Sequence, residues 1–404
     1  MTSKPLPTDP MIRELVRQAQ RSAMTRRTLL TGAAAGATGL ALAACSPGGG
    51  EAPTPAADES GTNKSVRWDN WALYVDVDDA GNYPTIDAFE AETGISVEYT
   101  EAVDDNNTYY AKVKDQLSLG QDIGADLVCL TDWIVARLIR FGYIQKLDHG
   151  NIPNIANLLP ALKDVDFDPG RQMSIPYQGG FAGIAWNKEQ LPSGLASVQD
   201  LWNPDLKGRV GVLSEMRDTM GLIMLDQGVD ISGKWGADEF NAAIDEFSKQ
   251  VSDGQIRNIK GNSYKEDLVN GDTLAAIVWS GDIVQLNAEN GDKWDFIVPE
   301  AGGTIWNDNF MVPIGSPSKS NAEELINYYY DPAVAAEVAA YVNYITPVAG
   351  AKEAAAAIDP ELASNTLIFP DDDMLSRSYV FRGLDNSEEQ AFNTAFQSVL
   401  LGSA

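Results

Sequence analysis

The sequence predicts an α/β fold built from two lobes, and three observations lead to this prediction. Short apolar segments rich in β-branched and aromatic residues alternate with segments whose apolar residues recur every three to four positions. The alternation continues along the chain without an internal repeat. About 340 residues follow Lys64, which is too many for one hydrophobic core of ordinary size, so two lobes are expected.

Each predicted element has a local reason in the sequence. The strands are short apolar runs, and they are expected at residues 66–68, 95–99, 125–130, 180–186, 209–213, 273–279, 295–299 and 310–314. The helices have apolar spacings near three and four, and they are expected at residues 84–92, 109–119, 133–141, 237–251, 322–330, 333–344 and 387–400. Several of these elements stop at a glycine, namely Gly94, Gly120, Gly142 and Gly254.

The segment before the fold has the pattern of an export signal. Arg26 and Arg27 are followed by Thr-Leu-Leu, which is typical of the twin-arginine signals of bacterial pathways that export folded proteins. The apolar run at 29–44 has 16 residues and three glycines, whereas a spanning helix needs roughly 20 apolar residues. We therefore predict that residues 1–44 are a cleaved signal peptide.

The end of this segment predicts a lipid anchor. Residues 42–45 read LAAC and resemble a bacterial lipobox, in which cleavage before Cys45 leaves a diacylglycerol on the new N-terminus. The alternative is an ordinary signal peptide with an incidental cysteine. Residues 46–63 are rich in Gly, Pro and Ala without apolar periodicity, so residues 45–63 are expected to form a flexible, membrane-anchored tether. Cys129 is then left without a disulfide partner and is expected to be a buried core residue.

The charge of the chain favours a cationic solute as partner. The chain has 29 Lys and Arg and 58 Asp and Glu. Residues 1–44 hold six of the basic and two of the acidic residues, so the remainder has 23 basic and 56 acidic residues and a formal charge of −33. Such a surface repels phosphate backbones and anionic headgroups, which argues against nucleic acid. Solubility or salt tolerance is the alternative explanation of the acidity.

Carboxylates and aromatic residues recur together after the predicted strands. The segments are DNWALY at 69–74, TDW at 131–133, SEMRD at 214–218, WSGD at 279–282 and WND at 306–308. In open α/β sheets, ligands collect at the carboxyl ends of strands. A carboxylate offers charge-assisted hydrogen-bond acceptors, and an indole face attracts a cation or packs a methylene chain. The pattern therefore fits a ligand with ammonium groups on an apolar stem, such as a linear polyamine.

The same residues also have structural interpretations. Glu215 and Asp218 could lie in the first turn of a helix capped by Ser214, where the helix dipole favours acids without any ligand. Packing in the core or between the lobes would equally explain the tryptophans, namely Trp71, Trp279 and Trp306.

The order of the segments resembles the spermidine/putrescine-binding components of bacterial polyamine ABC transporters, from about residue 66 to residue 344 and thinly beyond. The matching segments are NW at 70–71, FEAETGI at 89–95, ADLV at 125–128, SIPY at 174–177, DLWNPDLKG at 200–208, WSGD at 279–282, GGTIWND at 302–308 and YITP at 344–347. ETGI and LWNP occur across the wider superfamily of extracytoplasmic solute receptors. WSGD and WND are more discriminating.

The resemblance implies five aromatic ligand contacts. Trp71 and Tyr74 would line the side of the cleft that belongs to the first lobe. Trp279 and Trp306 would pack the methylene chain of the ligand, and Tyr344 would lie near an interlobe crossing.

It also implies a set of acidic contacts. Asp308 matches an acid that grips an amino group near the cleft centre, and Glu215 and Asp218 match a pair at one end of the ligand. Asp282 matches an acid of putrescine-preferring members. The chain departs from its relatives at Asp132, where they place a serine or tyrosine after the strand, so one more carboxylate is expected at the cleft. Residues 371–383 have no clear match to the last ligand contact of the family.

The family resemblance also implies a hinged two-lobed fold of the periplasmic binding protein type with a ligand cleft between the lobes. We expect residues 64–174 and 308–350 in lobe 1 and residues 175–307 and 351–404 in lobe 2. Crossings between the lobes are expected near 174–178, 304–307 and 349–353, and the lobes should close on the ligand.

Competing functions are less well supported by the sequence. A glycosidase needs a distinct pair of carboxylates, which no segment singles out. A Ser-His hydrolase would have only His149, in a loop without a nucleophile elbow. Tyrosine runs at 109–110 and 328–330 could suggest a ferric-ion receptor, but they fit helix positions. Residues 76–87 have part of a calcium-loop spacing. A structural lipoprotein that binds nothing is a further alternative.

The sequence therefore predicts a monomeric, lipid-anchored, extracytoplasmic receptor. It would capture spermidine or putrescine and deliver the polyamine to the permease and ATPase of an ABC importer, without enzyme activity, cofactor or metal. The alternative is a receptor of the same fold for another cationic or polar solute, or for ferric ion.

Overall fold

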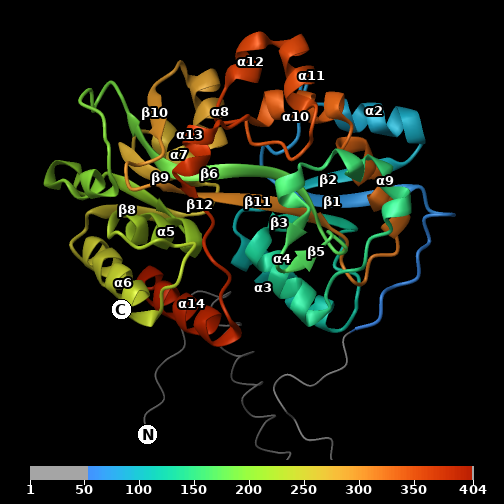
Figure 1. Cartoon of the computed structure of the whole chain (residues 1–404), viewed down its shortest axis with the longest axis horizontal. Helices are drawn as coiled ribbons and strands as arrows, with labels where there is room; N and C mark the ends of the chain where they lie inside the picture. Colours follow the sequence, from blue (N-terminus) through green and yellow to red (C-terminus); the bar gives the residue numbers. More distant parts are fainter. Residues whose placement is uncertain (1–52, 403–404) are drawn as a thin grey trace, which may run out of the picture. The chain divides into compact units, whose positions relative to one another are not determined.

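The computed structural model describes residues 53–402 (Figure 1). The predicted signal peptide and the predicted lipidation site Cys45 lie outside these residues. Within residues 53–402, no helix combines the length and the apolar character that crossing a bilayer requires.

One mixed sheet of ten strands organises the described residues. Eight strands follow one another in the order β2, β1, β3, β11, β6, β9, β7, β8, while β10 pairs with β6 and β12 pairs with β11. Their bounds are β1 (Ser65–Trp71), β2 (Ser96–Val103), β3 (Leu127–Thr131), β6 (Ile175–Asn187), β7 (Val210–Leu213), β8 (Ile256–Lys260), β9 (Ala275–Trp279), β10 (Trp294–Ile297), β11 (Gly303–Met311) and β12 (Ser378–Tyr379). A separate hairpin consists of β4 (Asp164–Val165) and β5 (Asp168–Pro169).

Two parallel halves of this sheet are joined by an antiparallel pair in the middle. Strands β1, β2 and β3 are parallel to one another, as are β7, β8 and β9. Between them, β11 pairs with β3 and with β6, and β6 pairs with β9. Figure 1 shows β6 and β11 running from one half to the other. We call the half around β1 to β3 lobe 1 and the half around β7 to β9 lobe 2.

Helices cover both faces of the sheet. They are α2 (Pro84–Thr93), α3 (Asn106–Ser118), α4 (Asp132–Phe141), α5 (Met216–Asp226), α6 (Ala237–Ser252), α7 (Tyr264–Val269), α8 (Ser280–Asn290), α9 (Lys319–Tyr329), α10 (Pro332–Val342), α11 (Ala351–Ile358), α12 (Pro360–Ser364), α13 (Asp372–Ser376) and α14 (Asn386–Leu400). Figure 1 shows α3 to α6 and α14 on one face, and α2, α8 and α10 to α12 on the other.

Local sequence signals explain where several helices begin and end. Helix α2 starts at Pro84, whose missing N–H is not needed there, and ends before Gly94 with φ of 71°. Asp105 caps α3 by accepting a hydrogen bond from a backbone N–H of the first turn. Asp385 caps α14, and Glu388 completes a capping box. These signals agree with the predicted helix positions.

The predicted elements are all found, but the prediction missed helices that begin directly after a strand. Each of the eight predicted strands overlaps an observed strand, and each of the seven predicted helices overlaps an observed helix. Helices α5, α7 and α8 are of this kind, and strand β8, helices α11 to α13 and the short strands β4, β5 and β12 were not predicted either. Ser214 does not cap α5, because its hydroxyl donates to Asp105 and the N-cap residue is Glu215. The last predicted strand, 310–314, begins too late, since β11 starts at Gly303.

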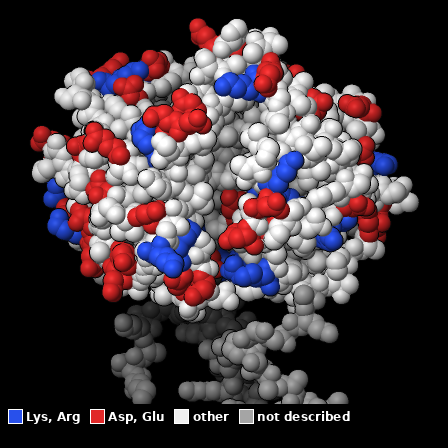
Figure 2. Space-filling view, in the orientation of Figure 1, with Lys and Arg blue, Asp and Glu red and all other residues white. Residues whose placement is uncertain are grey.

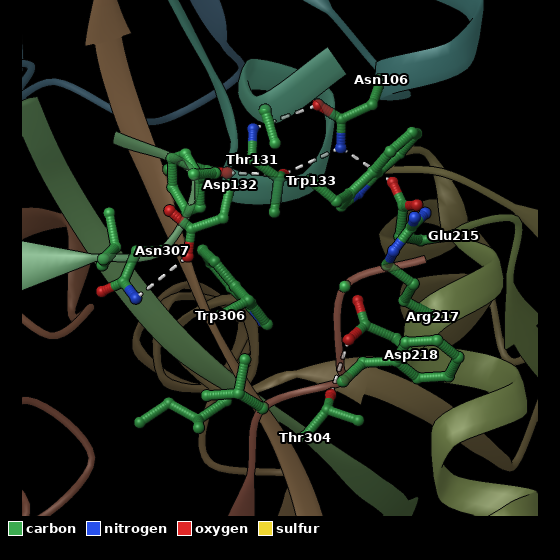
Figure 3. Close-up of a pocket in the computed structure, with 18 of the residues that line it drawn as sticks. Asn106, Thr131, Asp132, Trp133, Glu215, Arg217, Asp218, Thr304, Trp306 and Asn307 are labelled. Carbon is green, nitrogen blue, oxygen red and sulfur yellow. Dashed lines mark hydrogen bonds between the residues drawn. The ribbon is translucent and has the colours of Figure 1, made fainter. Parts of the chain in front are cut away.

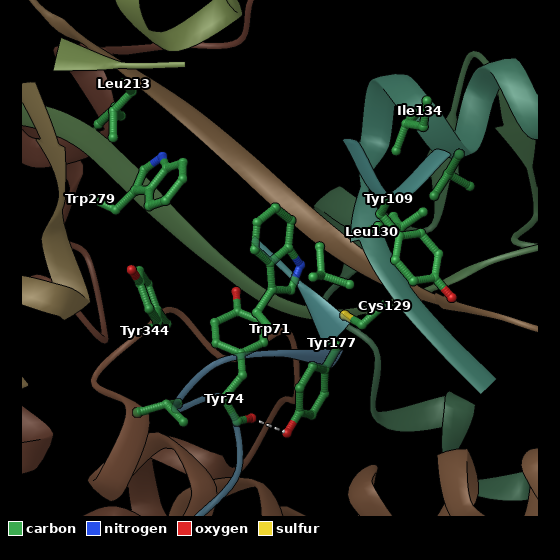
Figure 4. Packing of buried hydrophobic residues seen from close by; sticks show 14 of the residues in the cluster. Trp71, Tyr74, Tyr109, Cys129, Leu130, Ile134, Tyr177, Leu213, Trp279 and Tyr344 are labelled. Atoms are coloured by element: carbon green, nitrogen blue, oxygen red, sulfur yellow. Dashed lines mark hydrogen bonds between the residues drawn. The ribbon is translucent and has the colours of Figure 1, made fainter. Parts of the chain in front are cut away.

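Aromatic residues dominate the core around β1 in lobe 1. The ring centroid of Trp68 lies 5.1 to 5.7 Å from those of four aromatic residues, which are Tyr99, Tyr177, Phe310 and Tyr329. Cys129 is fully buried nearby as a free thiol, which confirms the predicted core position (Figure 4). Burial also raises the pKa of this thiol, so it is not activated as a nucleophile.

Candidate functional site

A cavity of about 990 Å³ lies between the two lobes. Figure 2 shows the surface hollowed between the two halves of the molecule. All ten residues that the sequence predicted to bind ligand line this cavity, namely Trp71, Tyr74, Asp132, Glu215, Asp218, Trp279, Asp282, Trp306, Asp308 and Tyr344. The fold therefore brings together residues as far apart in the sequence as Trp71 and Tyr344.

Five of these residues form a continuous aromatic wall. Trp279 lies between Trp71 and Trp306, with ring centroids 6.1 and 6.4 Å away, and Tyr344 contacts both Trp306 and Tyr74 at 5.4 Å. Figure 4 shows four of the five rings, those of Trp71, Tyr74, Trp279 and Tyr344. Such edge-to-face contacts hold the rings in fixed positions. The wall thus offers rigid apolar surface to whatever occupies the cavity.

Gly180 makes room for this wall. A Cβ atom at residue 180 would lie 2.7 Å from the Trp306 ring and 2.8 Å from the Tyr344 ring, which is closer than real Cβ contacts allow. Strand β6 therefore needs a glycine where it passes between the lobes, because a side chain there would displace both rings.

Asp308 lies at the centre of the cavity, where β11 reaches β3. Its carboxylate accepts hydrogen bonds from Thr131 Oγ1 at 2.6 Å and from Tyr74 Oη at 3.0 Å. Burial, together with the nearby charges of Asp132 and Asp218, raises the pKa of Asp308 to about 7. No basic side chain among the described residues forms an ion pair with Asp308. The centre of the site is therefore short of positive charge.

Glu215 and Asp218 provide the acidic pair at the start of α5. Asp218 accepts hydrogen bonds from Trp279 Nε1 at 2.8 Å and Thr304 Oγ1 at 2.6 Å, and burial raises its pKa. Glu215 Oε2 accepts from Asn106 Nδ2 at 2.8 Å, whereas Glu215 Oε1 is buried without a hydrogen-bond partner in the described part of the chain. Burial, followed by the charge of Asp105, raises the pKa of Glu215 to about 8.

The remaining two acids have different surroundings. Asp282 accepts from the hydroxyls of Tyr264 and Tyr344, and Lys265 Nζ lies 3.3 Å from its carboxylate, so its charge is already matched. Asp132 accepts from the amides of residues 307 and 309, which flank Asp308 in the strand. Because side chains alternate along a strand, Asp132 lines the cavity from the opposite face of β11.

The sequence analysis missed other residues that line the cavity, among them Arg217 and Asn307. Figure 3 shows Glu215, Arg217 and Asp218 on one side of the cavity and Asp132 and Asn307 on the other, with Trp306 between them. Further residues line it from the segments 161–167 and 380–385. The first segment contains β4 and the turn that leads to β5. The second segment lies within the region for which no family match was found or directly follows it. Neither segment has a strand or helix periodicity that could have marked it.

One charged cluster links the lobes at the edge of the cavity. Glu389 of α14 accepts hydrogen bonds from Arg137 at 3.0 Å and Arg140 at 2.9 Å, both on α4, and from Arg217 on α5 at 3.3 Å. The Arg217 guanidinium also lies 4.1 Å from the centre of the Trp133 ring. Helix α4 belongs to lobe 1, whereas α5 and α14 belong to lobe 2. The contacts of Arg137 and Arg140 with Glu389 therefore join the two lobes and require them to be closed.

The residues considered for metal or enzyme chemistry have structural partners instead. In the described residues, no group of three or more His, Cys, Asp or Glu is placed to hold a metal ion. Asp78, in the segment that resembles a calcium loop, accepts from backbone N–H groups of its own turn. Tyr109 donates to Asp69, and Tyr330 donates to a backbone carbonyl. His149 Nε2 lies 2.7 Å from a backbone carbonyl oxygen.

The raised pKa values predict that the empty protein becomes less stable as pH rises. In the unfolded chain, Glu215 and Asp308 ionise near pH 4, but in the folded protein they keep protons up to about pH 7 to 8. The folded state therefore binds more protons in this window, so the free energy of unfolding should fall with increasing pH. For Asp308, the difference between the pKa values of the unfolded and folded states corresponds to a total loss of stability on the order of 4 kcal/mol once the pH has passed both values.

Chemical unfolding of the empty protein from about pH 5 to about pH 8 tests this expectation. A Glu215→Gln, Asp308→Asn double variant is the control and should show a much smaller fall. A stability that rises over this range in the wild type and in the control alike would contradict the assignment of buried, proton-binding carboxyls.

Comparisons with known proteins agree on one kind of relative. The family of bacterial extracellular solute-binding proteins matches residues 85–370. The spermidine/putrescine-binding periplasmic protein of Escherichia coli is 30% identical over 312 residues, which cover 76% of this chain and 84% of the relative. The putrescine-binding periplasmic protein of the same organism is 27% identical over 356 residues, covering 84% and 92%. A solved structure assigned to a spermidine/putrescine ABC transporter of Listeria monocytogenes has 26% identity and a TM-score of 0.73, covering 84% of this chain and 99% of that one.

Proposed function

This chain belongs to the family of bacterial extracellular solute-binding proteins, and we propose that it captures spermidine or putrescine for an ABC importer. The permease and the ATPase of that importer are its proposed partners. The family binds solutes for transport rather than catalysing a reaction, and its named relatives are periplasmic.

One observation carries this proposal: three buried carboxyl groups line the cavity without an ion-pair partner within residues 53–402. They are Glu215, Asp218 and Asp308, each about 5% exposed or less. Burying an ionised carboxylate is unfavourable unless a positive charge lies beside it. For this reason burial raises the pKa values of Glu215, Asp218 and Asp308. An ammonium group would supply the missing charge. With Asp308 at the centre and two acids at one side, the site suits a ligand with more than one ammonium group.

The aromatic wall supports the same ligand class. Methylene chains between ammonium groups need apolar surface, and Trp279 and Trp306 present it between the acidic positions. Each cation–π contact adds roughly 0.5–2 kcal/mol once it is desolvated. Asp282 has its own lysine partner, so we propose that it orients Tyr344 rather than binding an ammonium directly.

Closure of the lobes follows from contacts on both sides of the cavity. Trp71 and Tyr74 belong to lobe 1, and Asp218 and Trp279 belong to lobe 2. A ligand that touches both lobes binds the closed form more tightly than the open form and so shifts the population toward it. We propose a hinge where β6 and β11 pass between the lobes, with the lobe boundaries expected from the sequence.

The N-terminal signals support the proposed location. Arg26-Arg27 and the segment LAAC at 42–45 favour twin-arginine export followed by lipidation of Cys45. We propose that the receptor is a monomer held at the outer face of the cell membrane by this anchor.

A receptor for another cationic or polar solute is the second candidate. It is favoured by Arg217, which adds a positive charge to the cavity wall beside Glu215 and Asp218. A solute with both ammonium and acceptor groups would use both kinds of side chain. Ferric ion has no comparable support, because none of the tyrosines considered for it is among the described residues that line the cavity, and Tyr109 and Tyr330 donate to other groups.

Thermal unfolding of the purified protein, titrated with candidate ligands, tests the proposal. We expect stabilisation by putrescine, spermidine or spermine, and none by maltose, lysine or ferric ion. A ligand at a hundred times its dissociation constant stabilises by about 2.7 kcal/mol, which raises Tm by several degrees. Stabilisation by lysine without any by the polyamines would support the second candidate. A response only to sugar or iron would contradict both.

A further inference from the structure

A chain of hydrogen bonds connects the central acid of the cavity with the acid at its side. Thr131 Oγ1 donates to Asp308 at 2.6 Å and itself accepts from Asn106 Nδ2 at 2.8 Å. The same nitrogen donates to Glu215 Oε2, also at 2.8 Å. Figure 3 shows the Asn106 side chain between Thr131 and Glu215. Four side chains from separate segments are thus joined in series.

The orientation of the Asn106 amide is determined by its partners. The backbone N–H of Thr131 donates to Asn106 Oδ1 at 3.2 Å, so the amide oxygen is directed away from Glu215. Both hydrogens of Nδ2 are then used, one for the Thr131 hydroxyl and one for Glu215. Asn106 is 1% exposed, which leaves no water to replace either bond.

This network crosses from one lobe to the other. Asn106 is the first residue of α3 in lobe 1, whereas Glu215 directly precedes α5 in lobe 2. The neighbouring pair formed by Asp105 and Ser214 crosses at the same place, with a bond of 2.8 Å. The Asn106–Glu215 bond therefore exists only when the lobes are close together.

The two oxygens of Glu215 have different roles available to them. Oε2 is taken by Asn106, while Oε1 is buried and has no hydrogen-bond partner among the described residues. A buried carboxylate oxygen without a hydrogen bond is unfavourable, so Oε1 is expected to accept a hydrogen bond from a ligand. The Glu215 side chain lines the cavity that a ligand would occupy.

We propose that Asn106 is a ligand-positioning residue: it holds Oε2 of Glu215 from the opposite lobe and leaves Oε1 to an ammonium group of the ligand. The inference rests on the proposed function, because it needs a cationic ligand. In this proposal, Asn106 couples the binding of the positively charged ligand to the closure of the lobes. The ligand reaches Glu215 in its binding orientation only in the closed form.

The charges around Glu215 fit this role. Asp105 and Asp218 disfavour its ionised form, whereas the Asn106 hydrogen bond and Arg217 favour it. Arg217 also forms an ion pair with Glu389, so its charge is divided between two acids. The two hydrogen bonds that Asn106 Nδ2 donates go to Glu215 and Thr131. Aspartate at position 106 would bring another carboxylate to Glu215, and alanine would remove both donors.

Titration calorimetry with putrescine and spermidine, on the purified wild type and on Asn106→Ala, tests the proposal. We expect Asn106→Ala to weaken binding at least about tenfold, because a hydrogen bond to a charged group is lost. In a Glu215→Gln background the same change should cost much less, since Asn106 acts through the carboxylate. A purely structural role would give the same loss in both backgrounds and would overturn the proposal.

Asn107→Ala is the matched control, since it removes the same side chain one position along α3, where no bond to Glu215 is made. If Asn106→Ala does not fold, Asn106→Ser replaces it, because serine suits the start of a helix but is too short to reach Glu215. A wild type that binds neither amine would overturn the proposed function and this inference with it. If the wild type binds an amine but the Asn106 variants bind it as tightly as Asn107→Ala does, this inference alone is overturned.

Discussion

An Asp308→Asn variant should bind its polyamine at least about 30-fold more weakly than the wild type, a loss of more than about 2 kcal/mol. The carboxylate is 3% exposed and receives only neutral hydrogen bonds, from Thr131 and Tyr74. An ammonium group bound against asparagine would remain desolvated and without its opposite charge. Titration calorimetry with putrescine and spermidine measures the loss directly.

Asp282→Asn is the matched control for this prediction. It makes the same substitution in the same cavity, but the Asp282 carboxylate is already paired with Lys265. Its effect on affinity should therefore be clearly smaller, even if its effect on stability is not. An Asp308→Asn protein with wild-type affinity would remove Asp308 from the binding site. Equal losses in the two variants would show that net charge, rather than a specific contact, attracts the ligand.

The positions of most candidate site residues follow from the sequence because they depend on strand ends. Tyr74 follows β1 and Asp132 follows β3 in lobe 1, whereas Asp218 follows β7 and Asp282 follows β9 in lobe 2. Within each lobe these strands are parallel, so their carboxyl ends lie at one edge of that half of the sheet. Recognising a strand and reading the next few residues is enough to bring such side chains together. All ten predicted residues line one cavity, although Trp306 and Asp308 lie within β11 and Tyr344 follows α10 rather than a strand.

The electrostatic state of each acid could not be predicted in the same way. Asp282 and Asp308 both follow the pattern of an acid beside tryptophan, yet in the described part of the chain Asp282 has a lysine partner and Asp308 has none. That difference depends on Lys265, which lies on another helix. A pattern along the chain describes neighbours in sequence, whereas the pKa of a buried carboxyl depends on neighbours in space.

Interlobe partners were missed for a related reason. Asn106 does follow a strand, β2, and the rule used for the other segments could have included it. Arg217 and Glu389, in contrast, are 172 residues apart and meet because α14 packs on α6, which in turn packs on α5. Strand β11 was placed too late because its first residues, beginning with Gly303, lack the apolar alternation of a half-buried strand.

Glu389→Gln should destabilise the empty protein by about 3 kcal/mol, since it removes the one acid that three arginines share. The side chains of Arg137 and Arg217 are 12% and 9% exposed, so water cannot replace the lost charge there. Arg140 is 39% exposed and should contribute little. Urea unfolding at neutral pH provides the measurement.

Glu388→Gln gives the comparison, because it makes the same change one residue earlier in α14. Glu388 pairs with Arg382 alone, and both side chains are more exposed, at 27% and 19%, so its loss should be about 1 kcal/mol or less. Because the Glu389 contacts join α4 of lobe 1 to α14 of lobe 2, Glu389→Gln should also weaken polyamine binding by making closure less favourable. If the two variants were equally stable and bound ligand equally well, the arginine cluster would contribute nothing to closure, and the closed form would depend on the cavity contacts alone.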